Sequence, residues 1–466
     1  MAAYDHVTPL THQGELPRCL ASIRDNGIQV PIVLLVVSEI GIEREASAKI
    51  CEIAFAFHET LDIRVVDAEI AAEFHTRADE LGISSIREGV SLVGYGATRN
   101  LGLIIAASLG FTELIFIDDD EVINTPDFLE QALYGLGKLS KKGIPVLVKS
   151  GFFIDRHGQW RSKQSNAWYN RFWEQGVLFN KWITNAMASP RLSRSNILNG
   201  GLMALHREAF RRVSFDAWIP RGEDLDYLLN IRMYGGGVWF DNQWHILHLP
   251  PPERNEAQRF KQDIYRWIYE ARKLEFSKSQ IDLLQIQPHS LDPYPGPFLE
   301  NSITTRVFVT ALLRTVGRPR DRQGYFKAAQ VARREARAYA EMLCSKYFEF
   351  QLGWAQILAT LEADPKLKVL FGEASRVVPT ETLDEEGAAI VGSDLLFAGS
   401  LSSATDQASA EASRLASQVA QENQEDSSSL SQTYTGDSPV SLVDLKPELF
   451  DFELDLEALG IDFDED

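Results

Sequence analysis

Four consecutive acidic residues, Asp118, Asp119, Asp120 and Glu121, follow the apolar run 114–117 without a spacer. Clustered carboxylates repel one another, and burial side by side raises their pKa values. A divalent cation relieves this repulsion. Hard oxygen ligands suit Mg²⁺ or Mn²⁺, which usually bind through one or two carboxylates plus phosphate oxygens. The run therefore predicts a metal–phosphate site, and a solvated acidic loop is the alternative.

The segments that lead to these acids alternate between strand and helix patterns. Residues 30–37 and 63–66 are typical of buried strands, residues 43–60 and 98–109 of helices, and residues 113–117 of a strand that runs straight into the acids. This alternation predicts an α/β fold with a mostly parallel, Rossmann-like central sheet. In such sheets ligands bind beyond the carboxyl ends of the strands, which is where the acids stand.

Two further blocks follow. In the first, residues 145–154 and 238–248 are expected to be strands, and residues 199–212 and 224–234 helices. Between them, residues 160–182 are rich in aromatic side chains, which predicts either a sugar-stacking loop or an apolar lid. In the second block, residues 257–276, 303–315 and 324–361 have helical spacing and predict an α-helical C-terminal appendage. We expect three regions: 1–252, 253–375 and a disordered acidic tail at 376–466.

The charge of the chain is concentrated in that tail. The net charge is -20, but residues 381–466 hold 21 acidic and two basic residues, so the remainder is nearly neutral. No basic face for nucleic acid is therefore expected. The tail is either solvated or a docking segment for a protein partner. Three widely spaced cysteines, no secretory signal pattern and no apolar run of about 20 residues predict a cytoplasmic protein without a transmembrane segment.

Four motifs, in order along residues 5–250, resemble family 2 glycosyltransferases of the GT-A fold. Arg99-Asn100-Leu101-Gly102, then a helix, an apolar strand and the acid run, are similar to the segment "A-R-N-x-G … D-x-D", with Thr98 in place of the alanine. Residues 7–15 and 16–23 look like the opening strand and first helix. Residues 199–210 look like the segment "G-G-x-x-x-x-R-R-E-A-F", and residues 222–226 like "E-D-x-D".

The resemblance implies a metal-dependent transfer of a sugar from a nucleotide-sugar donor to a hydroxyl acceptor, which is a small molecule, a glycan or a lipid-linked molecule. It implies Asp224 as the general base of an inverting reaction, with Glu223 holding the acceptor or the base. The expected metal ligands are Asp120, His248 and, beside the ribose or at the metal, Asp118. The other donor-contacting residues would be Pro9, Thr11, Glu39, Arg99, Asp119 and Gly201.

Each role has a plainer alternative. Arg99 could pair structurally with nearby acids, and Glu223-Asp224 could serve only the dipole of the helix that starts there. His248 could be an ordinary surface or core histidine, and Asn100 is expected to cap a helix. A Ser38-Glu39 corner replaces the family's usual acids, which leaves the nucleotide base open.

Other activities remain as alternatives. A retaining transferase would not use Asp224 as a base, and an inactive scaffold would act through its tail. Arg314, Arg318, Arg320 and Arg322 leave peripheral membrane contact open. A sugar nucleotidyltransferase is disfavoured because residues 1–30 contain no glycine-rich phosphate loop.

Overall fold

The computed structural model describes residues 8–251 and 256–373. The prediction of a disordered tail at 376–466 lies outside the described residues, as do positions 1–7 and 252–255.

The described strands form two sheets. β1 (Ile32–Leu35) and β2 (Ile63–Val66) make a parallel pair. The larger sheet has the order β3-β7-β5-β8-β4, with β6 added on β8. Its strands are β3 (Glu113–Phe116), β4 (Glu121–Val122), β5 (Val148–Ile154), β6 (Leu192–Arg194), β7 (Met203–His206) and β8 (Val238–His248). With the helices around both sheets, this confirms the predicted mixed α/β class.

The expectation of a mostly parallel sheet is wrong for the larger sheet. Among its described pairings only β5–β8 is parallel, and β7 runs antiparallel to both β3 and β5. Two of the antiparallel pairings involve the short strands β4 and β6 on β8, which were not expected. The other two come from residues 199–212, which were expected to be a helix. Their apolar run is only four residues long, and a run of that length does not separate a buried strand from a helix turn. Here it forms β7, followed by the short helix α7 (Arg207–Phe210).

Both faces of β7 are buried. Met203 and Leu205 contribute to one apolar core, whereas Leu202 and Ala204 contribute to the other. This alternation places a core on each side of the sheet, which explains why these segments are apolar at every position rather than at alternate ones.

Helices cover these strands. In the first two thirds of the chain they are α1 (Leu16–Asp25), α2 (Glu43–Phe55), α3 (Ala68–Glu80), α4 (Tyr95–Ser108), α5 (Phe128–Leu133), α6 (Gln175–Met187) and α8 (Glu223–Met233). The expected opening strand is not found within residues 8–15. Pro9 lacks an N–H for pairing, the N–H of His12 bonds to its carbonyl at 2.9 Å, and Gly14 has φ +70, so this segment turns.

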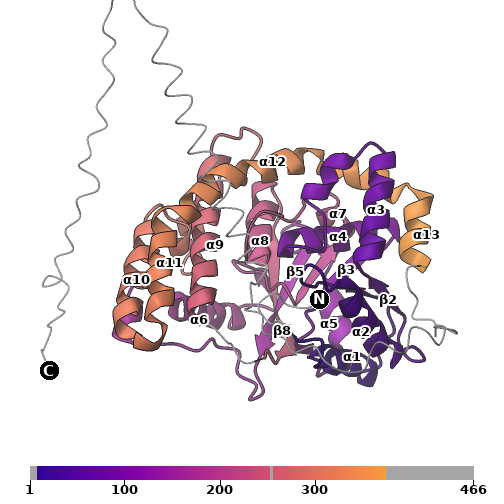
Figure 1. Ribbon diagram of the computed structural model, residues 1–466, viewed down its shortest axis with the longest axis horizontal. Helices are drawn as coiled ribbons and strands as arrows, with labels where there is room; N and C mark the ends of the chain where they lie inside the picture. The colour runs from indigo at the N-terminus through magenta and orange to yellow at the C-terminus, as the bar shows by residue number, and fades with distance from the viewer. Residues whose placement is uncertain (1–7, 252–255, 374–466) are drawn as a thin grey trace, which may run out of the picture. The chain divides into compact units, whose positions relative to one another are not determined.

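The C-terminal helices are α9 (Glu256–Ser277), α10 (Ile303–Gly317), α11 (Arg322–Arg333), α12 (Glu335–Glu362) and α13 (Pro365–Glu373). The single helix expected at 324–361 is broken at Arg334, where φ is -125. Figure 1 shows α9, α10 and α11 side by side, with α12 leading from them across to α13 beside α3.

α13 and the residue before it pack against α3, in the first third of the chain. Arg77 of α3 donates to Asp364 at 2.6 Å, and Phe371 of α13 packs against Phe74. No helix within the described ranges is long and apolar enough to cross a membrane.

Candidate active site

The acid run forms a tight turn between β3 and β4. The backbone N–H of Glu121 bonds to the carbonyl of Asp118 at 3.3 Å, and the N–H of Asp118 donates to Oε2 of Glu121 at 3.0 Å. Glu121 is almost fully buried, and burial raises the pKa of its carboxyl well above the ordinary value, with the charge of Asp118 adding to the effect. Glu121 therefore closes the turn, whereas Asp118 and Asp119 remain half-buried.

Arg99 joins the two acidic motifs. It lies on α4, its side chain is 1% exposed, Nη2 donates to Oδ1 of Asp118 at 3.1 Å, and Nε donates to Oε1 of Glu223 at 3.3 Å. Burial opposes its charge, but Asp118 and Glu223 raise its pKa above the ordinary value. Its third nitrogen, Nη1, is buried and has no hydrogen-bond partner. Arg99 thus pairs with nearby acids, which was the structural alternative considered from the sequence. Its Nη1 remains as a hydrogen-bond donor without a partner.

Gly200 and Gly201 lie between these acids. A Cβ on Gly201 would stand 2.1 Å from Oε1 of Glu121, and one on Gly200 would stand 2.8 Å from Nη2 of Arg99. The N–H of Gly200 donates to Oδ2 of Asp224 at 3.1 Å. The two glycines are thus required by the close approach of charged side chains on both sides.

Glu223 and Asp224 begin α8, but their surroundings differ. Glu223 is buried, and desolvation raises its pKa to about 7 although Arg99 opposes the shift. The side chain of Asp224 is 27% exposed. It accepts the N–H of Gly200 at Oδ2 and that of Leu225 at Oδ1, at 2.7 Å. Asp224 is therefore the more accessible carboxylate of the pair.

The third acid of this motif, Asp226, has a structural environment. It is fully buried, and Lys273 of α9 donates to both of its oxygens at 2.7 and 2.8 Å. The same ammonium group reaches Asp216 at 2.7 Å. Asp226 thus fixes α8 to α9 and is not offered to a ligand.

Asp120 and His248 face each other across the β4–β8 pair. The register aligns Glu121 with His248, and Nε2 of His248 lies 3.3 Å from Oδ2 of Asp120. No group of three or more His, Cys, Asp or Glu side chains with metal-binding geometry occurs within residues 8–251 and 256–373. The carboxylate suits Mg²⁺ or Mn²⁺, with the remaining ligands from water and substrate phosphates, whereas the imidazole is a ligand that transition metals prefer. Of the two expected ions, the donor chemistry of this pair fits Mn²⁺ better than Mg²⁺.

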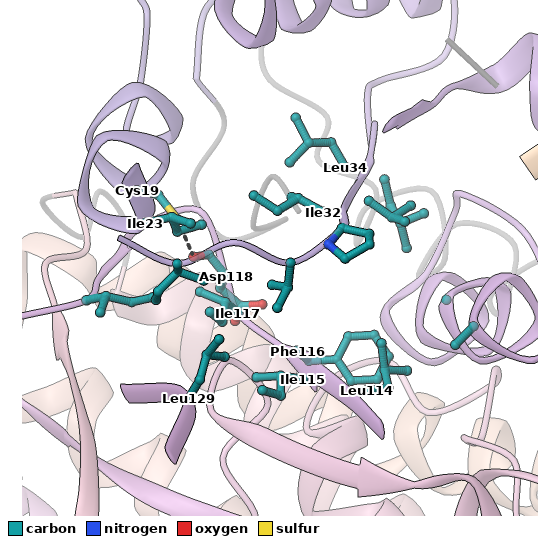
Figure 2. A pocket seen from close by; sticks show the side chains of 18 of the residues that line it. Cys19, Ile23, Ile32, Leu34, Leu114, Ile115, Phe116, Ile117, Asp118 and Leu129 are labelled. Carbon is teal, nitrogen blue, oxygen red and sulfur yellow. Dashed lines mark hydrogen bonds between the residues drawn. The ribbon is translucent and has the colours of Figure 1, made fainter. Parts of the chain in front are cut away.

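Asp119 lies beside an apolar cavity of about 420 Å³. Burial, with the charges of Asp120 and Asp118, raises the pKa of Asp119 to about 7. The cavity lies between β1 and β3 and is closed on one side by α1. Figure 2 shows Ile32 and Leu34 on one side and Ile115 on the other.

Three residues that the sequence predicted to contact the nucleotide sugar lie away from the acid run. Pro9 and Thr11 are exposed in the turn before α1, where Lys49 of α2 donates to the Pro9 carbonyl at 3.0 Å. Glu39 is exposed after β1. Within the described residues no hydrogen bond or ion pair joins any of them to Asp118.

Asn100 does not cap a helix as expected. It lies inside α4, which begins at Tyr95 after Gly94, and its amide bonds to the backbone of Gly89 and Phe215 at 2.8–3.0 Å. Its role is to hold the segment after α7 against α4.

Two residues near the site were missed from the sequence. Cys19 of α1 directs its thiol to the Asp118 carbonyl at 3.8 Å, as Figure 2 shows, and burial raises its pKa to about 12. Arg266 of α9 lies 3.9 Å from Oδ1 of Asp224. No local spacing links either residue to the acidic motifs, so the sequence carried no signal for them.

No protein-family model matches the chain, and no curated protein matches it. Among solved structures, the chain is similar to a mannosyltransferase from Pyrobaculum calidifontis in complex with GDP-Man and Mn²⁺. The identity is 14%, the match covers 76% of this chain and 88% of that one, and the TM-score is 0.29. It is also similar to GalNAc-T7 with UDP, GalNAc and Mn²⁺, at 13% identity, 63% and 57% coverage and a TM-score of 0.28. The first is a mannosyltransferase by name, and both were solved with Mn²⁺. At such TM-scores the two matches carry no weight for function.

Proposed function

We propose that the chain is a metal-dependent glycosyltransferase that moves a sugar from a nucleotide-sugar donor to a hydroxyl acceptor with inversion. The observation that carries the proposal is the convergence of two acidic motifs on Gly200-Gly201. Arg99 bridges Asp118 and Glu223 there, with the accessible Asp224 alongside.

The residues divide the work of a single displacement. The carboxylate of Asp224 takes the proton from the acceptor hydroxyl as the acceptor oxygen bonds to the anomeric carbon. The bond from that carbon to the diphosphate oxygen breaks at the same time, and its electron pair leaves with the diphosphate. Nη1 of Arg99 is a buried N–H group without a hydrogen-bond partner, which is costly. It is suited to donate a hydrogen bond to an oxygen of the nucleotide sugar.

Asp120 and His248 would hold the metal ion, with Asp118 beside them. A bound divalent ion supplies positive charge that stabilises the leaving diphosphate. This division keeps the metal residues and the base on different elements: the former lie on the turn between β3 and β4 and at the end of β8, and the base lies at the start of α8. Each group can therefore be removed separately.

The experiment is a panel of UDP- and GDP-sugars with Mn²⁺, scored by thermal stabilisation and by release of nucleoside diphosphate. We expect at least one donor to stabilise the protein only when metal is present. If neither a nucleotide sugar nor a nucleoside diphosphate raises the melting temperature with Mn²⁺, the proposal fails.

Variants then separate the roles. Asp120→Ala and Asp224→Ala should both abolish transfer, but only Asp120→Ala should weaken metal-dependent nucleotide binding. Asp25→Ala, whose side chain is 61% exposed on α1, is the control and should change neither. Equal loss of binding in both site variants would contradict the assignment. An anomeric configuration retained in the product would exclude Asp224 as the base of a single displacement.

A further inference from the structure

Arg266 reaches the candidate base from the C-terminal helices. It lies on α9 with a side chain only 12% exposed, and Nη2 stands 3.9 Å from Oδ1 of Asp224. Its Nε donates to Oε1 of Glu270, one turn further along α9, at 3.3 Å. Its guanidinium also lies over the ring of Trp267, 4.7 Å from the centroid. The side chain is therefore held by two neighbours, Glu270 and Trp267, in addition to its contact with Asp224.

The start of α8 is shaped to admit this arginine. Gly222, the residue before Glu223, has φ +76, and a Cβ there would stand 2.1 Å from Nε of Arg266. Any side chain at this position would displace the guanidinium. The glycine thus provides both the left-handed backbone that starts α8 and the space beside Asp224.

In the described structure Arg266 forms the ion pair with Asp224, at 3.9 Å. The hydrogen bonds to the Asp224 carboxylate come from two backbone N–H groups, those of Gly200 and Leu225. Arg99 acts on Glu223 and Asp118, and Lys273 acts on Asp226 and Asp216. Each of these four acids is thus paired with a cation other than Arg266, whose ion-pair partners are Glu270 and Asp224, and the charge of Arg99 also acts on Asp224.

We propose that Arg266 is a positioning residue for the transfer reaction, which orients the Asp224 carboxylate towards the acceptor and is itself held by Glu270. This rests on the proposed function, in which Asp224 is the base. It assigns the helical C-terminal region a direct part in the chemistry, because α9 supplies the group that orients a residue of α8.

The test measures hydrolysis of the active nucleotide sugar, with water as acceptor, and the dissociation constant of the matching nucleoside diphosphate with Mn²⁺. Arg266→Met should lower kcat about 100-fold, since small misplacement of a reacting group costs that much. KM for the donor and the dissociation constant should stay unchanged. Arg266→Lys keeps the positive charge but not the planar guanidinium, and its kcat should lie between those of Arg266→Met and wild type. Arg272→Met, an exposed arginine on the same helix, is the control.

A double-mutant cycle separates positioning from a general structural role. In an Asp224→Asn background Arg266→Met should cause no further loss, because the residue that it orients is already disabled. An equal loss in both backgrounds would overturn the proposal, as would wild-type kcat in Arg266→Met. If Arg266→Met does not fold, Arg266→Lys in the same two backgrounds carries the test.

The outcomes also distinguish a failure of the Arg266 proposal from a failure of the proposed function. If wild type hydrolyses no donor and binds no nucleoside diphosphate, the proposed function fails and the inference falls with it. If wild type is active, Asp224→Asn is inactive and Arg266→Met is unchanged, only the inference fails.

Discussion

The buried Arg99 forms an ion pair with the half-buried Asp118, with Nη2 of the arginine 3.1 Å from Oδ1 of the aspartate. The pair joins α4 to the turn after β3, and through Glu223 it also joins the start of α8. One guanidinium thereby sets the spacing between the candidate metal site and the candidate base.

Removal of that guanidinium should strongly destabilise the protein. Arg99→Met leaves Asp118 and Glu223 facing each other without a cation, and breaking a buried pair costs about 3–5 kcal/mol. Urea unfolding should show this loss. Arg44→Met, whose partner Glu69 is 3.9 Å away and whose side chain is 91% exposed, should stay within about 0.5 kcal/mol of wild type. A loss in Arg99→Met as small as that of Arg44→Met would mean that the pair is dispensable.

Gly201→Ala should disrupt the acid run directly. The new Cβ would displace Glu121, whose Oε2 accepts the Asp118 N–H, and overpacking of this kind costs about 1–3 kcal/mol. We expect weaker Mn²⁺-dependent nucleotide binding, measured by calorimetry. Gly372→Ala is the control, since its Cβ would meet Leu109 at an ordinary 3.7 Å. Unchanged nucleotide affinity in Gly201→Ala would show that the turn does not depend on this approach.

The buried carboxyl group of Glu270 should make the stability of the protein depend on pH. Burial raises its pKa to about 8 from 4.5, even though Arg266 opposes the shift. Between these values the folded protein keeps the proton that the unfolded chain loses. The free energy of unfolding therefore falls as pH rises, by up to about 1.4 kcal/mol per unit, and levels off above the folded pKa.

Glu270→Gln removes this titration. Relative to wild type the variant should gain stability from pH 5 to pH 8, measured by urea unfolding at each pH. Glu275→Gln on the same helix, with a side chain 41% exposed, is the matched control. A difference between Glu270→Gln and wild type that does not change with pH would refute the assignment.

Phe371 should be essential for the packing of α13. It is fully buried against Phe74 of α3, and truncation of a buried phenylalanine costs about 3–5 kcal/mol. Phe371→Ala should lower the unfolding midpoint in urea accordingly. Val369→Ala, on the same helix and 53% exposed, should have little effect. Equal midpoints for the two variants would show that α13 adds no stability.

Two strands were predicted from the sequence with the bounds that the structure has. β8 has the predicted bounds Val238–His248, and β2 matches residues 63–66. β7 was missed because four buried apolar residues have no distinguishing period. The wrong directions expected around β3 and β5 followed from that error, since β7 lies between them, and β4 and β6 add antiparallel pairs of only two and three residues.

The candidate site was predicted in part for a similar reason. Residue type and order along the chain led to Asp118, Asp120, Glu223 and Asp224, since acids after a strand and at a helix start are visible in one segment. The cations that hold them come from other elements. Arg266 lies on a helix whose own pattern is simply amphipathic, so its contact with Asp224 arises only from tertiary packing.

The return of α13 onto α3 also has a consequence during synthesis. Arg77 and its partner Asp364 are separated by 287 residues. At about 5–20 residues per second, the partner emerges roughly 15 to 60 s after α3 does. Throughout that interval the apolar surface around Phe74 lacks its cover on the ribosome. The nascent chain therefore exposes an apolar patch, to which chaperones can bind, long before α13 is synthesised.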